Sequence, residues 1–174
     1  IAQAIFKDIV AENKTFEKIV DQQYCKKCER FLADRFVKGE CPMCHYGDAK
    51  GDQCDGCGKL INATELINPQ CSSCDTTPEV RQSKHIFIDL PKIQPDLEKW
   101  VAKQSVNWSA NSVSFTNTML KGGLLGRCIT RDLKWGTPVP LEEFKEKVFY
   151  VWFDAPIGYI SITACYTDEW KQWW

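Results

Sequence analysis

The sequence lacks several features that would each place it in a common functional class. Its 22 Lys and Arg residues are balanced by 23 Asp and Glu residues, so the broad positive surface that coats nucleic acid is absent. Residues 1–20 mix charged with apolar side chains and do not form a secretory signal. The long stretch with fewest charges, residues 148–166, is interrupted by Asp154, Pro156 and Gly158. We therefore expect a soluble protein with no membrane partner.

Common catalytic signatures are missing as well. The sequence contains neither a G-x-G-x-x-G fingerprint nor a Walker loop. It has only two histidines and no nucleophile elbow. A hydrolase that pairs a nucleophile with a base is therefore disfavoured.

Cysteine is abundant by contrast. Eight of the ten cysteines form C-x-x-C pairs, with 12, 9 and 13 residues between consecutive pairs. The pairs are Cys25/Cys28, Cys41/Cys44, Cys54/Cys57 and Cys71/Cys74. Two thiolates on one tight turn can face a single ion, and two such turns complete a tetrahedral zinc site. The four pairs predict two structural zinc ions within residues 24–80, where apolar residues are sparse and metal binding would supply folding energy.

Three other interpretations of the cysteines compete with zinc. A disulfide framework would need a secretory context, which the sequence does not supply. A redox dithiol would be a single pair rather than four. The segment from Cys41 to His45 matches the C-x-x-C-H pattern of c-type haem attachment, but the other three pairs lack the histidine. We expect His45 to be a solvated neighbour of the zinc site, with replacement of Cys44 as a ligand as the alternative.

The pairing of the four turns is open at this point. Sequential pairing would join the first pair to the second and the third to the fourth. Nested pairing would give an inner site from the two central pairs and an outer site from the two flanking pairs. The nine-residue gap between the central pairs is the shortest and mildly favours nesting, but spacing alone does not decide.

Periodicity outlines the remaining elements. The start of the chain has the spacing of an amphipathic helix, and a strand follows Asn13-Lys14. Residues 148–153 form an aromatic, apolar run typical of a buried strand, with Asp154 placed to cap a following helix. A ligand site at the C-terminal end of that strand would lie at residues 152–159. Further elements are predicted as a strand at 81–90, with His85 structural, and helices from Pro95 through Val101 and at 111–120.

One long string resembles a known family. Residues 148–159 read VFYVWFDAPIGY, and this string is similar to methionyl-tRNA synthetases. Further similar segments are DRFVKG at 34–39, GDQC at 51–54 and HIFIDLP at 85–91. CITRD at 128–132 and WGTPVP at 135–140 resemble class I synthetases more widely. The four C-x-x-C pairs fit the eukaryotic cytosolic or archaeal type.

The resemblance implies an α/β fold: part of a split Rossmann catalytic domain with an inserted zinc-knuckle connective domain of short β-strands. Residues 1–22 would end the first Rossmann half, and 23–126 would be the insertion, with its zinc knuckles at 24–80. Residues 127–174 would begin the second half. Some bacterial relatives lack both outer pairs together, which implies nested zinc sites. The inner ligands would then be Cys41, Cys44, Cys54 and Cys57, and the outer ligands Cys25, Cys28, Cys71 and Cys74.

The same resemblance implies an activity and its residues. The family uses ATP, with Mg²⁺, to convert L-methionine to methionyl-adenylate, and then transfers methionine to tRNA(Met) in the cytoplasm. The methionine pocket would include Trp152, Ala155, Pro156 and Tyr159, because a thioether is selected mainly by shape and aromatic faces. Arg131 matches a family arginine on the nucleotide side, where a guanidinium stabilises phosphate charge.

The family's HIGH-like and KMSKS-like motifs are not found in the sequence, so we expect a fragment that is inactive alone. Membership in a complex with other synthetases is a further partner that the resemblance allows. An alternative is a non-enzymatic zinc-ribbon module that binds nucleic acid or protein, for which residues 24–80 alone would suffice. A synthetase for Val, Ile or Leu is a third hypothesis, disfavoured by APIGY at 155–159 and by the compact insertion.

Overall fold

The computed structural model describes residues 1–51 and 53–174, so Asp52 of the family-like segment 51–54 lies outside the described residues. The chain forms two compact units. The first comprises Ile1–Glu17, Ile86–Ile129 and Tyr150–Trp174, and the second comprises Lys18–His85 and Thr130–Phe149. Within the described part of the chain, no helix is long and apolar enough to cross a membrane.

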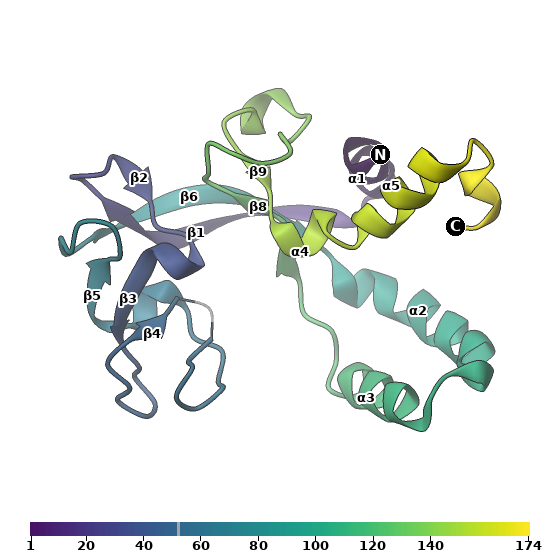
Figure 1. The fold of residues 1–174 in the computed structure, drawn as a ribbon, viewed down its shortest axis with the longest axis horizontal. Coiled ribbons are helices and arrows are strands. Elements are labelled where there is room, and N and C mark those ends of the chain that lie inside the picture. Colours follow the sequence, from purple (N-terminus) through teal and green to yellow (C-terminus); the bar gives the residue numbers. More distant parts are fainter. Residues whose placement is uncertain (52) are drawn as a thin grey trace. The chain divides into compact units, whose positions relative to one another are not determined.

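The first unit is mainly helical (Figure 1). Its elements are α1 (Ala2–Ala11), α2 (Leu90–Gln104), η3 (Ser105–Asn107), α3 (Ala110–Lys121), β7 (Arg127–Cys128), α4 (Val151–Asp154), α5 (Ile157–Tyr166) and η5 (Trp170–Gln172). The predicted amphipathic helix at the start of the chain is confirmed as α1, which buries Phe6 against an edge of the Phe153 ring. Helix α3 confirms the helix predicted at 111–120. It ends at Lys121, and Gly123 shortly after it has a φ of 75°, the left-handed conformation that glycine commonly supplies at a helix end.

Helix α2 begins earlier than predicted. Asp89 caps it by accepting a hydrogen bond from the backbone N–H of Lys92, and Pro91 occupies the first turn. Pro95, which the sequence suggested as the start, lies inside the helix instead. The preceding strand is correspondingly shorter at its end, because Asp89 and Leu90 belong to the helix cap and first turn. Within this unit, the Gln94 side chain bonds Leu120 and Leu124 and so ties α2 to the end of α3.

The second unit contains short strands joined by turns. Its elements are β2 (Arg30–Phe31), η1 (Asp34–Phe36), β3 (Val37–Glu40), β4 (Ala49–Lys50), η2 (Ala63–Glu65), β5 (Ile67–Cys71), β8 (Thr130–Arg131), η4 (Glu142–Phe144) and β9 (Val148–Phe149). Strands β1 (Thr15–Cys25) and β6 (Glu79–Ile88) are long and each continues from one unit into the other. One sheet has the order β2-β1-β6-β7, a second has β4-β3-β5, and β8 pairs with β9.

One core cluster of the second unit is small and rich in sulfur. Four of its nine buried residues are cysteines, and the other five are Leu32, Val37, Ala49, Ile61 and Leu66. Strand β3 lies between β4 and β5, and a Cβ at Gly39 would come within 2.9 Å of the Ile67 carbonyl oxygen. Glycine is therefore required at position 39, where β3 passes close to the backbone of β5. Because this cluster contains so few apolar side chains, we expect the cysteine groups to contribute to the stability of this part of the unit.

The strand predicted at 148–153 is largely wrong. Only Val148–Phe149 forms a strand, and it pairs antiparallel with β8 rather than lying in a parallel sheet. Residues 151–154 are helical, and Asp154 lies inside α4 instead of capping the next helix. Pro156 precedes α5 and no side-chain cap is formed there. The positional argument for a ligand site at the end of a parallel strand therefore does not hold, although the mixed α and β class does.

Candidate functional site

All four C-x-x-C turns share one backbone conformation. The residue after each second cysteine adopts a left-handed backbone, with φ values of 49°, 60°, 71° and 53° at Glu29, His45, Gly58 and Asp75. In the last three turns the N–H of that residue donates to the carbonyl of the first cysteine at 2.7–3.0 Å. Backbone N–H groups also point at the first sulfur of three pairs, at 3.3–3.4 Å. Such N–H donors favour the thiolate, which is the form that ligates metals.

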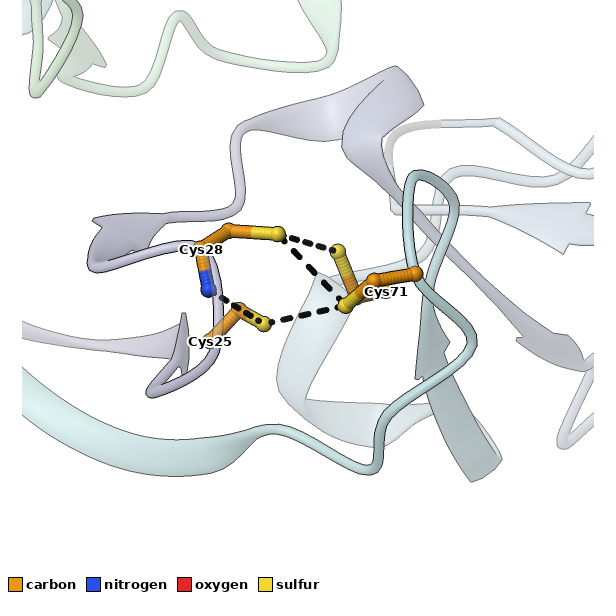
Figure 2. Close-up of side chains that lie close together, drawn as sticks. Cys25, Cys28 and Cys71 are labelled. Atoms are coloured by element: carbon orange, nitrogen blue, oxygen red, sulfur yellow. Dashed lines mark hydrogen bonds between the residues drawn. The ribbon is translucent and has the colours of Figure 1, made fainter.

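The outer cluster joins the β1–β2 turn to the turn after β5 (Figure 2). Its ligand atoms come from Cys25, Cys28, Cys71 and Cys74, with the first cysteine of each pair fully buried. The sulfur of Cys74 lies 3.5 Å from those of Cys25 and Cys28, and the sulfurs of Cys28 and Cys71 are 3.9 Å apart. Figure 2 shows the sulfurs converging on a common centre.

The inner cluster contains Cys41, Cys44, Cys54 and Cys57. Cys41 and Cys54 are fully buried, whereas Cys44 is exposed, and the Cys44 and Cys54 sulfurs are 3.6 Å apart. His45 remains exposed and bonds Glu40 at 2.6 Å. Among the described residues it joins neither group, and the grouping of the turns is the nested one.

Both clusters have the dimensions of a four-thiolate metal site. In each group the four sulfurs lie within 4.8 Å of one another. Zinc–sulfur bonds of about 2.3 Å in a tetrahedron place the sulfurs roughly 3.8 Å apart, which matches the separations found here. Four soft sulfur donors at this spacing could hold zinc ions.

The pKa values of two thiols in the outer cluster are shifted in opposite directions. Hydrogen bonding by Thr76, whose hydroxyl lies 3.4 Å from the Cys74 sulfur, lowers the pKa of Cys74 to about 6. The Cys74 sulfur in turn raises the pKa of Cys28 to about 12. One thiolate thus opposes ionisation of its neighbour, and a bound dication is what would allow all four to ionise together.

The four residues expected to line a methionine pocket lie on one exposed helical face. The backbone stays helical through Ala155 and Pro156, so Trp152, Ala155, Pro156 and Tyr159 follow the i, i+3, i+4, i+7 spacing of a single stripe. Trp152 is 73% exposed and Tyr159 is 67% exposed. The structure therefore places these side chains together on the surface of the first unit, with their aromatic faces accessible.

Arg131 belongs to the second unit, on β8, and is half-buried. Its Nη1 donates to the carbonyl of Thr130 at 3.0 Å. Beside it lies a group that the sequence did not predict, in which Asp132 is bound by His85, Lys147 and Ser83. His85 is structural, as predicted, with ring nitrogens bonded to Thr130 and Gln22. In the sequence, its position in an alternating strand was the only signal for a structural role, because its hydrogen-bond partners are distant in sequence.

The chain matches known proteins over its whole length. The family profile described as "tRNA synthetases class I (M)" covers residues 1–174. The chain is 60% identical to the probable methionine–tRNA ligase, cytoplasmic, of Dictyostelium discoideum, covering all of this chain and 24% of that protein. It is 55% identical to the cytoplasmic methionine–tRNA ligase of Homo sapiens, covering 20% of that protein. The chain thus spans a quarter or less of these relatives.

Solved structures give a more distant likeness, which bears on the fold alone. Mycobacterium tuberculosis methionyl-tRNA synthetase in its apo form has a TM-score of 0.58 at 16% identity, covering 99% of this chain and 30% of that one. The same enzyme in complex with methionyl-adenylate has a TM-score of 0.53 at 17% identity, covering 92% of this chain and 26% of that one. With a family profile matched from the first residue to the last, this chain belongs to the class I tRNA synthetases of the methionine type.

Proposed function

We propose that this chain is the part of a methionine–tRNA ligase that carries the zinc insertion and one wall of the methionine pocket. The observation that carries the proposal is the 60% identity, over the whole of this chain, to a relative named for that activity. On this proposal residues 1–22 end the first Rossmann half, 23–126 form the insertion, and 127–174 begin the second half. The site of action is the cytoplasm, as the names of the relatives state for those proteins.

The two cysteine clusters are proposed as structural zinc sites, the inner held by the central turns and the outer by the flanking turns. The sulfur separations and the N–H groups directed at the first cysteines support this assignment. All four positions of each site are filled by cysteine, so neither leaves a position open for catalysis. The metal would supply folding energy that the small core does not.

The exposed helical face is proposed to receive the methionine side chain. Trp152 and Tyr159 offer flat apolar surfaces, and the Tyr159 hydroxyl is a donor that suits the weakly accepting thioether sulfur. Ala155 and Pro156 between them are small enough to leave space for an unbranched side chain. Methionine would thus be selected by shape and aromatic contact rather than by charge.

Arg131 is proposed to act on the nucleotide side. The reaction joins the methionine carboxylate to the α-phosphate of ATP and releases pyrophosphate; the terminal ribose hydroxyl of tRNA(Met) then takes the methionyl group and AMP leaves. A guanidinium that meets the phosphates, together with Mg²⁺ bound to ATP, would offset the charge that develops there. No covalent intermediate with the protein is needed, so the residues act by positioning and electrostatics. Association with other synthetases is a further proposal, which rests on the family alone.

The test is a chimaera in which this chain replaces the matching 24% of the Dictyostelium relative. We expect methionine-dependent exchange of pyrophosphate into ATP, and charging of tRNA(Met), with Val, Ile and Leu inactive as controls. A chimaera that folds and binds zinc but exchanges no pyrophosphate with methionine would contradict the proposal. That result would favour the alternative of a zinc-ribbon binding module.

A further inference from the structure

A cluster of polar side chains in the second unit is unused by the proposed chemistry. We name it the Asp132 cluster, and it consists of Ser83, His85, Thr130, Asp132 and Lys147. Ser83 and His85 come from β6, Thr130 from β8, and Lys147 from the residue before β9. His85 and Thr130 are fully buried, and Ser83 is 8% exposed. A polar group so far from water requires a structural or functional reason.

Every member of the Asp132 cluster is hydrogen-bonded. His85 contacts Thr130 through Nδ1 at 2.9 Å and Asp132 through Nε2 at 3.0 Å. The Ser83 hydroxyl donates to Asp132 at 2.8 Å, and the Lys147 ammonium donates to both Asp132 and Ser83. Burial of Asp132 opposes its ionisation, but the hydrogen bonds from His85, Lys147 and Ser83 prevail and hold its pKa at about 2. The carboxylate is therefore charged at neutral pH and bound from two sides.

Arg131 lies in the sequence between two members of the Asp132 cluster. Thr130 and Asp132 stand two residues apart and both reach His85, so they lie on the same face of the chain. Arg131 lies between them, and the alternation of an extended strand directs its side chain to the opposite face. Across the hairpin Arg131 faces Val148, next to Lys147. The cluster thus holds in place the residues before and after Arg131, and through Lys147 it also holds the start of the partner strand.

A slip of this hairpin by one residue would be costly. It would place Arg131 against His85 and leave the Asp132 carboxylate and the Lys147 ammonium without their buried partners. The β8–β9 ladder pairs Thr130 with Phe149 and Arg131 with Val148, and a hydrogen bond from the Tyr150 N–H to the Ile129 carbonyl extends it. A ladder this short leaves part of the register to side chains, and the Asp132 cluster adds side-chain specificity to the backbone bonds.

We propose that Asp132 and His85 are positioning residues that fix the face and register on which β8 presents Arg131 to the nucleotide. This inference rests on the proposed function for the role of Arg131. Asp132 itself touches no substrate in this scheme and acts only through its neighbour. Removing its charge would let β8 shift, and misplacement by about 1 Å can reduce a rate roughly 100-fold.

A double-mutant cycle in the chimaera tests the proposal. Asp132→Asn should lower kcat/KM for ATP in the exchange reaction by roughly 10- to 100-fold. In an Arg131→Ala background the same change should cost less than about 2-fold, because the group being positioned is gone. Lys84→Ala is the matched control, since Lys84 neighbours both Ser83 and His85 but pairs with Glu143 at the surface, and it should leave kcat/KM unchanged.

Ser83→Ala keeps the test usable if Asp132→Asn does not fold. It removes one hydrogen bond to the carboxylate and should give the same dependence on Arg131 with a smaller loss. Equal losses with and without Arg131, for either variant, would overturn the inference while leaving the proposed function intact. An inactive wild-type chimaera would instead contradict the proposed function, and the positioning role with it.

Discussion

Half of the cysteines in the two clusters are fully buried, whereas the aromatic side chains proposed to bind methionine are exposed. In both clusters the first cysteine of each pair is fully buried, and the sulfurs face one another. Trp152 and Tyr159 are instead more than two-thirds exposed. We therefore expect the clusters to hold their own unit together, and the aromatic face to contribute little to folding and to be available for binding.

The two clusters also differ from each other. Cys28 and Cys71 of the outer cluster are 43 residues apart, whereas Cys44 and Cys54 of the inner cluster are ten apart. Closing the longer loop removes more entropy from the unfolded chain, by about 1.3 kcal/mol on a simple polymer argument. The outer cluster also joins the end of β1 to the end of β5, and the inner cluster lies within the loop that it closes. Loss of the outer cluster should therefore be the more damaging.

The largest expected effect follows from a change in the outer cluster. Cys71→Ser should remove the outer zinc ion and lower the unfolding midpoint of the chain by roughly 10 °C or more, because several kcal/mol of metal-coupled folding energy are lost. Thermal unfolding followed by circular dichroism measures this. Cys165→Ser is the control, since Cys165 is exposed and outside both clusters, and should leave the midpoint unchanged. Equal midpoints for the two variants would refute the proposed structural role.

The smallest expected effect on stability comes from the exposed face. Trp152→Ala should change the free energy of unfolding by no more than about 0.5 kcal/mol, because the side chain is mostly in water. In the chimaera the same change should raise KM for methionine at least about 10-fold through loss of an aromatic wall. Phe153→Ala is the matched control for stability, since its ring packs against Phe6 at a centroid distance of 6.4 Å. Unchanged methionine kinetics in Trp152→Ala would remove this residue from the pocket.

Much of the metal module could be predicted from spacing, because two cysteines on one tight turn leave few geometries open. The left-handed backbone of the residue after each second cysteine could not be predicted, since only Gly58 among the four residues is a glycine. Nesting was suggested by the resemblance and not settled by spacing. The run at 148–153 is rich in residues that favour strands, yet tertiary context made half of it helical. The Asp132 cluster could not be predicted from the sequence, because Ser83 and Asp132 are 49 residues apart.

We propose that the chain holds two nested four-cysteine zinc sites, and the decisive experiment is to measure the zinc content of the wild-type chain and of Cys54→Ser. We predict two zinc ions per reduced wild-type chain, one for each sulfur group. We predict one ion in Cys54→Ser, with cobalt substitution still giving the spectrum of an intact four-thiolate site. Loss of four-thiolate coordination at the outer cysteines in Cys54→Ser, or a wild-type chain with disulfides in place of zinc, would rule out two nested zinc sites.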